Sequence, residues 1–262
     1  MHHLLSLWPD SWTRQQRSSA TLLASGLLLL LILWLIALPL SWAPEPIGNN
    51  AQLFAQGTRV TVELTVVSGI AGVLLGIVAA LGKVSRVPPL RWVAGFYVWV
   101  MRGTPLLVQV LFVYFALPEL HPVLRMDEFT AACVALALNV GAYNAEAIRA
   151  GLLAVPKGQI EAARSLGMGR WYTFADVTFP QAFKIALPPL VNNVVALLKD
   201  SSLAFTIGVV ELTNAGSQVK STSFQAVPVF IATAIIYLLL TSVMTQMSDA
   251  IERRFDVEGK LA

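Results

Sequence analysis

The sequence is poor in charged residues and nearly lacks cysteine. Only 13% of its 262 residues are Asp, Glu, Lys or Arg, whereas 56% are hydrophobic, and this composition lies well outside that of soluble globular domains. The single cysteine, Cys133, excludes an internal disulfide and is expected to pack as a small side chain within its apolar run. We therefore expect an integral membrane protein.

The residues of common catalytic and nucleotide-binding sites are also missing. His2, His3 and His121 lie at one end and in a connection, without the spacing of a metal site or of a serine–histidine–aspartate constellation. No segment matches the phosphate-binding sequence G-x-x-x-x-G-K-[ST], so this chain is not expected to bind ATP. The net charge of +3 is spread over several loops, which argues against a nucleic-acid partner. We expect no catalytic residue, metal ligand or cofactor on this chain.

Six apolar stretches are long enough to cross a membrane, because a hydrocarbon core of about 30 Å needs a helix of about 20 residues. They run from about Ala20 to Leu40, Thr58 to Gly82, Arg91 to Leu117, Phe129 to Gly151, Lys184 to Gly208 and Ala226 to Ala250. The pattern predicts an all-α bundle with six spans in the lipid bilayer.

The positions of Lys and Arg give the orientation of these spans, since basic connections stay in the cytoplasm. The connections assigned to the cytoplasm contain Arg14, Arg17, Lys83, Arg86, Arg91, Arg149, Lys157, Arg164, Arg170, Lys184, Arg253, Arg254 and Lys260. The connections on the other side carry only Arg59, Arg125 and Lys220. Both termini are therefore expected in the cytoplasm.

The first span also has some features of a secretory signal. Two arginines precede its apolar run, and Ser41-Trp42-Ala43 is a small-x-small triplet of the kind that follows a signal core. However, the apolar run of about 20 residues exceeds the usual 7 to 15. We favour a retained transmembrane helix; cleavage would leave a mature chain that begins near Pro44, outside the cytoplasm.

A polar segment between Pro156 and Pro180 interrupts the apolar chain. Pro156 is tolerated at the start of a helix. Ile160, Ala163 and then Leu166 or Gly167 recur at steps of three and four residues, which gives a narrow apolar stripe. Such a stripe of short side chains suits a groove on a partner protein, and Gly167 is placed to end the helix in a left-handed cap.

A second short element is expected after this helix. Trp171, Phe174 and Val177 are spaced to face one side, and Pro180 is expected to stop the element.

The same segment closely resembles the EAA loop of ABC-transporter permeases of the binding-protein-dependent import class. The matching residues are Glu161-Ala162-Ala163, Gly167 and Val177-Thr178-Phe179-Pro180, with Val177 and Phe179 where the family usually has Ile and Leu. The resemblance implies that this helix docks on a dimer of ATPase subunits, which would bind ATP and magnesium. The residues implied in this coupling are Glu161, Ala162, Ala163, Arg164 and Gly167.

Three further stretches resemble permeases for polar amino acids of the histidine, glutamine, arginine and glutamate type. They are Arg102-Gly103-Thr104-Pro105-Leu106-Leu107-Val108-Gln109, Gly141-Ala142-Tyr143-Asn144-Ala145-Glu146, and Lys199-Asp200-Ser201-Ser202-Leu203 with Ile207-Gly208-Val209. The resemblance covers roughly Leu53 to Phe255. It implies a type I ABC importer fold in the cell inner membrane, partnered by a second permease copy or a related permease and by a periplasmic amino-acid-binding protein.

The family commonly has five spans, whereas this chain is predicted to have six. The additional span lies before the region of resemblance, so we divide the chain into three parts. Residues 1–52 form a cytoplasmic segment, an extra transmembrane helix and a periplasmic linker. Residues 53–255 form the permease domain with the coupling loop at 156–180, and residues 256–262 form a cytoplasmic tail.

Ionisable residues within spans indicate a polar pathway, because each costs at least about 2.5 kcal/mol to place in a bilayer. Arg102, Glu146, Lys199 and Asp200 are such residues, and the sequence Gly103-Thr104-Pro105 predicts a helix break whose freed backbone groups line the pathway. The full set of candidate substrate contacts is Arg102, Asn139, Tyr143, Asn144, Glu146, Asn192, Asn193, Lys199, Asp200, Ser201 and Ser202.

Ionisable residues within the spans also have explanations other than a substrate pathway. These charged residues could pair structurally, Lys199 with Asp200 or Arg102 with Glu146. The stretch from Arg91 to Met101 could lie along the interface, so that the span begins near Arg102. Gly69, Gly72 and Gly76, and Pro188 with Pro189, more readily explain close packing and helix shape than binding.

Two functions from different classes fit these features. The favoured one is the permease subunit of an ABC importer for polar or charged amino acids. The alternative is an ion-coupled secondary transporter that uses Glu146 and Asp200 as ion sites, although the internal repeats usual in such proteins are not evident. The transported amino acid, and the choice between two identical permeases and two related ones, cannot be derived from this sequence.

Overall fold

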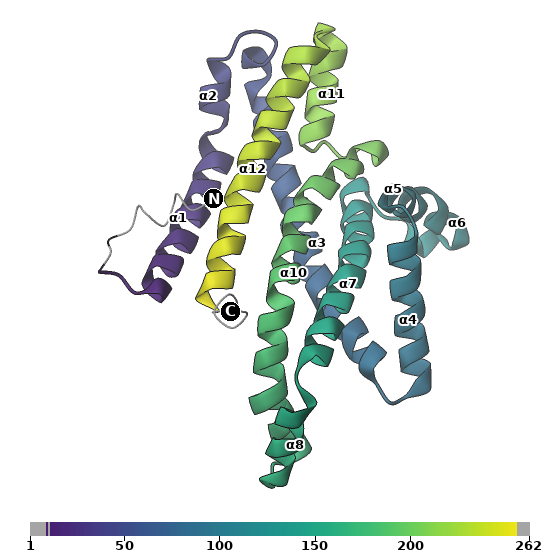
Figure 1. Ribbon diagram of the computed structural model, residues 1–262. Coiled ribbons are helices and arrows are strands. Elements are labelled where there is room, and N and C mark those ends of the chain that lie inside the picture. The colour runs from purple at the N-terminus through teal and green to yellow at the C-terminus, as the bar shows by residue number, and fades with distance from the viewer. Residues whose placement is uncertain (1–8, 10, 256–262) are drawn as a thin grey trace.

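The protein is a bundle of long helices, described by a computed structural model for residue 9 and residues 11–255 (Figure 1). The long helices are α1 (Arg14–Leu35), α3 (Ala51–Val84), α4 (Pro88–Gly103), α7 (Glu128–Ala154), α10 (Phe179–Asp200) and α12 (Ala226–Arg254). In the described residues, five helical segments are long and apolar enough to cross a membrane, and a bent pair makes up to six. The predicted all-α membrane bundle is confirmed. The predicted cytoplasmic tail at 256–262 lies outside the described residues, as do residues 1–8 of the amino-terminal segment.

Short helical elements connect the long helices. They are α2 (Ala37–Ser41), η2 (Gly48–Asn50), α5 (Leu106–Leu111), the π-helix η3 (Phe112–Ala116), α6 (Leu117–Leu120), η4 (Pro122–Leu124), α8 (Lys157–Ser165), α9 (Arg170–Tyr172), the π-helix η5 (Thr173–Thr178), the 3₁₀-helix η6 (Ser201–Ile207) and α11 (Leu212–Ser223). In Figure 1, α8 lies at one extreme of the bundle, while α2 and the end of α11 lie at the other.

Helices α3 and α7 form the central pair of the bundle, and glycines allow their close approach. A Cβ at Gly76 would lie 2.6 Å from Cβ of Asn144 and 3.2 Å from the carbonyl oxygen of Gly141. A Cβ at Gly72 would collide with Val140, whereas one at Gly69 would make an ordinary 3.6 Å contact with Leu197. The packing role predicted for Gly72 and Gly76 is thus confirmed, and small residues set the helix separation as they do in other membrane bundles.

The third predicted span is not one straight helix. Helix α4 ends at Gly103, and the segment from Leu106 to Leu120 continues at an angle of 111° to it. The break has a physical cause: Pro105 has no N–H to donate to the carbonyl of Met101, and its ring disfavours helical geometry in the preceding residue. Helix α4 packs lengthwise along α3 and α7 (Figure 1). The alternative in which residues 91–101 lie along the interface is therefore wrong.

The fifth predicted span begins earlier than expected, because Pro180 does not stop the helix. A helical segment runs from Arg170 to Ile207, with the π-helix η5 immediately before Pro180. Pro180 occupies the first turn of α10, where a missing N–H is tolerated. Because η5 has the wider hydrogen-bonding pattern of a π-helix, the helix continues through Pro180. The prediction that Pro180 ends a separate short element is therefore wrong. Pro188 and Pro189 also lie inside α10.

Helix α1 packs mainly against α12, at the edge of the bundle (Figure 1). Its amino end is fixed by a capping box, in which the Thr13 hydroxyl accepts from the N–H of Gln16 and the Gln16 side chain accepts from the N–H of Thr13. Ser18, Ser25 and Ile36 are buried. Whether this helix is retained after membrane insertion stays a prediction.

A substitution at the contact between α3 and α7 tests this account of the packing. We expect Gly76→Val to lower the melting temperature of the detergent-solubilised protein, because overpacking a tight contact costs about 1–3 kcal/mol. Gly95→Val is the matched control, since a Cβ at Gly95 meets nothing within 4 Å. Equal melting temperatures for the two variants would show that the contact does not limit helix separation.

Candidate functional site

The helix at the end of the bundle has the predicted cap. Pro156 precedes α8, and Gly167 adopts a left-handed conformation with φ of 82°. The N–H of Met168 donates to the carbonyl of Ala163 (3.1 Å), and the N–H of Gly167 donates to that of Arg164 (2.9 Å). This pair of bonds is a Schellman motif, which uses glycine because a Cβ is unfavourable at that φ.

Most of the predicted coupling residues lie on the surface of α8. Glu161, Ala162, Arg164 and Gly167 are exposed, and Glu161 forms no ion pair with another described residue. Ala163 differs, since it is buried within the chain's own fold and is not free to contact a partner. Leu166, from the predicted apolar stripe, is 84% exposed. The outer face of α8 therefore carries a carboxylate, a guanidinium and one large apolar side chain.

Helix α8 is attached to two of the long helices. It follows α7 directly through Val155 and Pro156, and the Gln181 side chain of α10 donates to the Gln159 side chain of α8. Close packing supports this end of the bundle, because a Cβ at Gly151 would lie 2.6 Å from the carbonyl oxygen of Ala182. Helix α8 is therefore in direct contact with both α7 and α10.

A row of aromatic side chains follows α8. The sequence spacing predicted that Trp171 and Phe174 face the same side, but it did not predict the rest of the row. Trp171 contacts Phe174 with ring centroids 6.3 Å apart, and the row continues through Phe179 and Phe183 to Phe255. These rings join the start of α10 to the end of α12.

The break between α4 and α5 is stabilised by two buried amides. Gln109 donates to the carbonyl of Met101 (2.8 Å) and to the carbonyl and hydroxyl of Thr104 (3.2 and 2.9 Å). Asn139 of α7 donates to the same Met101 carbonyl (3.3 Å) and to the side-chain oxygen of Gln109 (3.0 Å). Gln109 thus replaces the donor that Pro105 lacks, and it satisfies backbone groups that are costly to leave unpaired inside a membrane.

A cavity of about 330 Å³ lies beside this break. Its polar walls come from three places in the chain: Thr104 at the break, Asn139 and Tyr143 on α7, and Asn193 and Asp200 on α10. The remaining lining residues are Pro105, Leu106, Val140, Ala196 and Leu203. The structure therefore brings together four of the eleven predicted pathway residues with the predicted helix break.

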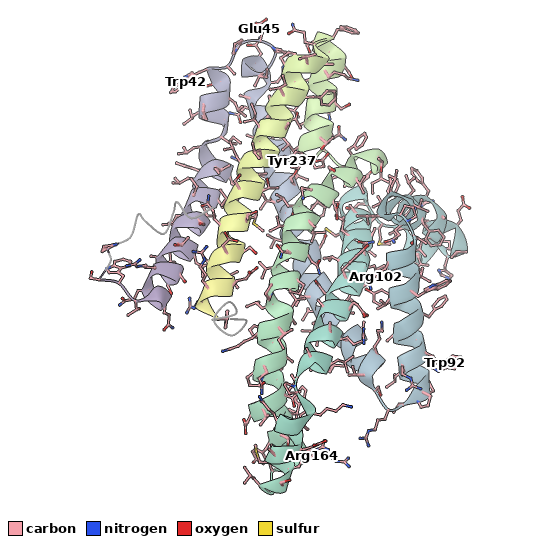
Figure 2. All side chains as sticks on the ribbon, viewed as in Figure 1. Trp42, Glu45, Trp92, Arg102, Arg164 and Tyr237 are labelled. Carbon is pink, nitrogen blue, oxygen red and sulfur yellow. The ribbon has the colours of Figure 1, made fainter. Side chains whose placement is uncertain are left out.

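Arg102 stands next to this cavity. Its guanidinium carbon lies 5.2 Å from the centroid of the Tyr143 ring, within the range of a cation–π contact. Tyr143 is 15 residues after the start of α7 and 11 before its end, or about 22 and 17 Å along the helix axis. Arg102 is thus near the middle of the bundle, as its predicted depth requires (Figure 2).

Other predicted pathway residues lie elsewhere. Lys199 and Ser202 line a second cavity of about 320 Å³ with Thr213, Phe230, Thr233, Ala234 and Tyr237. No ion pair joins Lys199 to Asp200 in the described part of the chain. Ser201 is buried and donates to the carbonyl of Leu198, and Asn192 is exposed without lining the first cavity. Because neighbouring residues on a helix point about 100° apart, Asp200 faces the first cavity and Lys199 faces the second.

Asn144 and Glu146 have local partners. Asn144 is fully buried, and its side-chain oxygen accepts from Asn193 (2.9 Å), while its nitrogen has no hydrogen-bond partner among the described residues. Glu146 accepts from Lys83 of α3 (2.7 Å) and from Arg149. The alternative pairing of Glu146 with Arg102 is wrong. The carboxylate of Glu146 instead ties α7 to the last turn of α3, which leaves it unsuited to binding a substrate ammonium group.

Sequence reasoning missed Gln109 as a site residue and missed the role of Glu211. Glu211 is completely buried before α11, where it accepts from the N–H groups of Thr213 and Asn214 and from the hydroxyl of Tyr237, each at 2.8 Å. Burial raises the pKa of Glu211, and these hydrogen bonds act against that shift. The position of Glu211 immediately before a helix was the available signal, since an acidic side chain there caps free N–H groups.

Comparison with known proteins gives a consistent result. Residues 72–257 match the family described as binding-protein-dependent transport system inner membrane component. The L-cystine transport system permease protein TcyB of Bacillus subtilis is 40% identical over 205 residues, which are 78% of this chain and 87% of that protein. The glutamine transport system permease protein GlnP of Escherichia coli is 38% identical over 205 residues, covering 78% and 94%.

Solved structures share the fold. One described as an amino acid ABC transporter with histidines has a TM-score of 0.74 at 40% identity and covers 79% of this chain and 95% of its own. The MetNI methionine ABC transporter in an inward-facing conformation has a TM-score of 0.65 at 19% identity, with coverage of 81% and 99%. The second likeness supports the fold alone.

The amides at the helix break are open to a direct test. We expect Gln109→Leu to reduce stability by about 1–3 kcal/mol, because the Met101 and Thr104 carbonyls lose a buried donor. The measurement is the melting temperature in detergent, with Gln52→Leu on the exposed surface of α3 as the control. A Gln109→Leu protein as stable as the control would mean that the break does not depend on this side chain.

Proposed function

The chain belongs to the binding-protein-dependent transport system inner membrane components, and from that premise we propose that it conducts polar or charged amino acids through an ABC importer. As a permease subunit, it is a multi-pass protein of the inner membrane and not itself an ATPase. The family assignment also implies a binding protein and an ATPase as partners. ATP and magnesium belong to that ATPase subunit in this proposal.

The cavity beside the α4–α5 break is the observation that carries the substrate assignment. An α-amino acid has an ammonium group, which needs acceptors, and a carboxylate, which needs donors. Asp200 and the amide oxygens of Asn139 and Asn193 supply acceptors. Tyr143, the nearby Arg102 and the Asn193 N–H that does not bond to Asn144 supply donors, whereas both N–H groups of Asn139 are engaged at the helix break. Leu106 and Leu203 give the same cavity an apolar wall.

The relatives agree with a substrate of this chemical class. Their names specify cystine and glutamine as cargo, and these compounds share the α-ammonium and α-carboxylate groups. A site that recognises the shared groups tolerates different side chains. The final choice of amino acid then rests with the periplasmic binding protein.

Coupling to ATP hydrolysis is assigned to α8. Its exposed residues Glu161, Ala162, Arg164, Leu166 and Gly167 form the surface proposed to enter a cleft of the ATPase. The two permeases of the importer, identical or related, would each present one such helix to an ATPase dimer. Closure of the dimer then displaces α8, and the shared attachment to α7 and α10 carries the movement to both walls of the cavity.

The alternative of an ion-coupled secondary transporter is not retained. It required Glu146 as an ion site, and this carboxylate is engaged by Lys83 and Arg149. The family match also belongs to an ATP-driven class of transporter.

Charge reversal on α8 tests the coupling assignment. We expect Glu161→Lys to reduce co-purification of the ATPase and to lower its substrate-stimulated activity about tenfold or more, since about 1.4 kcal/mol of lost contact energy weakens affinity tenfold. Glu119→Lys, at an exposed position on α6, is the control. Normal ATPase stimulation and transport in Glu161→Lys would refute the role given to α8.

A pair of adjacent substitutions tests the cavity assignment. We expect Asp200→Asn to reduce amino-acid uptake in proteoliposomes about tenfold, because a hydrogen bond to a charged group contributes about 1.5–3 kcal/mol. Lys199→Gln should change uptake much less, since Lys199 lines the other cavity. Assembly with the ATPase is measured for both variants. Equal uptake by Asp200→Asn and the parent protein would remove Asp200 from the pathway.

A further inference from the structure

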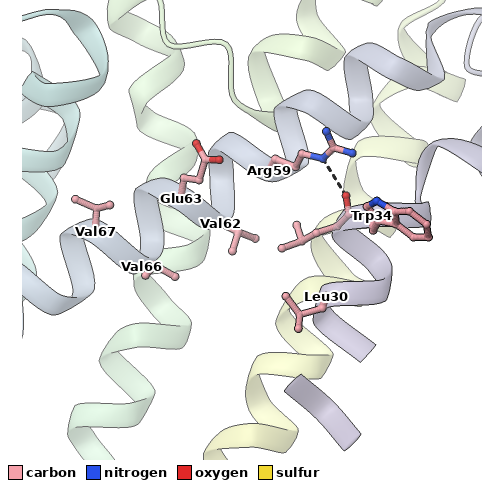
Figure 3. Close-up of a pocket in the computed structure, with 8 residues that line it drawn as sticks. Leu30, Trp34, Arg59, Val62, Glu63, Val66 and Val67 are labelled. Carbon is pink, nitrogen blue, oxygen red and sulfur yellow. Dashed lines mark hydrogen bonds between the residues drawn. The ribbon is translucent and has the colours of Figure 1, made fainter. Parts of the chain in front are cut away.

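A groove lies between α1 and α3, on a side of the bundle that the substrate pathway does not use (Figure 3). Its volume is about 620 Å³, within the range of ligand-binding pockets. Helix α1 packs mainly on α12 and barely on α3, and this arrangement leaves the groove open. The lining residues are Leu30, Leu33, Trp34, Arg59, Val62, Glu63, Val66 and Val67.

The groove is polar at one end only. Arg59 and Glu63 are its two charged residues, and residues 64–82 of α3 contain no Asp, Glu, Lys or Arg. At 1.5 Å per residue that uncharged run is about 28 Å long, which nearly matches a hydrocarbon core of about 30 Å. Lys83 follows the run at its cytoplasmic end. Arg59 and Glu63 therefore lie beyond the opposite end of this uncharged run, on the side of the outer leaflet.

Arg59 is held in position by α1. Its Nε donates to the carbonyl of Leu33 at 2.9 Å, at the place where α1 ends and α2 begins (Figure 3). Its two terminal nitrogens have no hydrogen-bond or ion-pair partner among the described residues. A fixed guanidinium with free N–H groups is well suited to bind a phosphate group.

Glu63 lies one helical turn from Arg59, and no ion pair joins them in the described chain. The polar end of the groove, formed by Arg59 and Glu63, thus has one positive and one negative group and a net charge of zero. That pattern complements a headgroup with one phosphate and one ammonium, and it disfavours a headgroup that is only anionic.

We propose that this groove binds a zwitterionic phospholipid from the outer leaflet, one whose headgroup has a single phosphate and a single ammonium, such as phosphatidylethanolamine. The phosphate contacts Arg59, the ammonium contacts Glu63, and one acyl chain lies against Leu30, Val66 and Val67. The order of polarity along the groove, charged at the membrane boundary and apolar toward its centre, is that of the lipid itself. The bound lipid fills the space between α1 and α3.

Lipid retention by the intact importer tests the charged end of the groove. The complex is reconstituted in nanodiscs with equal amounts of phosphatidylethanolamine and phosphatidylglycerol, released, and analysed by native mass spectrometry. We expect the parent protein to retain phosphatidylethanolamine, Arg59→Gln to retain several-fold less, and Glu63→Gln to shift retention toward phosphatidylglycerol. Arg125→Gln, outside the groove, should match the parent protein.

A second pair of variants tests the apolar end. Val66→Trp fills the groove and should abolish the retained lipid, whereas Val78→Trp, at an exposed position on the same helix, should not. If Val66→Trp fails to fold, the headgroup preference of Glu63→Gln still decides the question. Unchanged retention and preference in every variant would overturn the proposal. So would a photoreactive residue at position 30 that cross-links to a protein chain instead of lipid, because the groove would then be a protein interface.

Discussion

The structure depends on one constraint, which is that backbone groups freed by a helix break inside a membrane must find partners. Pro105 removes the donor for the Met101 carbonyl, and the buried amides of Gln109 and Asn139 replace it. Their bonds stabilise the break at which the segment from Leu106 to Leu120 turns by 111° from α4, and Thr104 lies there beside a cavity. A helix that continued straight would satisfy the same backbone without these amides, but it would leave no polar space next to Asn193 and Asp200.

The cavity and α8 are connected, because helices α7 and α10 line the cavity and also support α8. Helices α7 and α10 contribute Asn139, Tyr143, Asn193 and Asp200 to the cavity, and their other ends support α8. Close glycine contacts make this connection stiff, both between α3 and α7 and between α7 and α10. In the proposed mechanism, a force on α8 reaches the cavity through packed helices rather than through a flexible loop.

Features that depend on local chemistry could be predicted from the sequence. The spans follow from hydropathy, the cap at Gly167 from the cost of a left-handed Cβ, and the break from Pro105. Features that depend on distant partners could not. Glu146 pairs with Lys83, 63 residues away, and Lys199 and Asp200 are adjacent in sequence yet line different cavities. The prediction that Pro180 ends a helix was wrong for a different reason, which is that a π-helix before Pro180 lets the helix continue.

The location of a bound amino acid is the most direct test of this account. It can be measured by cryo-electron microscopy of the purified importer, with its ATPase and binding protein, in the presence of substrate. The account predicts density for the substrate between Thr104, Asn193 and Asp200, beside the Arg102–Tyr143 contact. Substrate density in the cavity lined by Lys199 and Tyr237, with the first cavity empty, would contradict it.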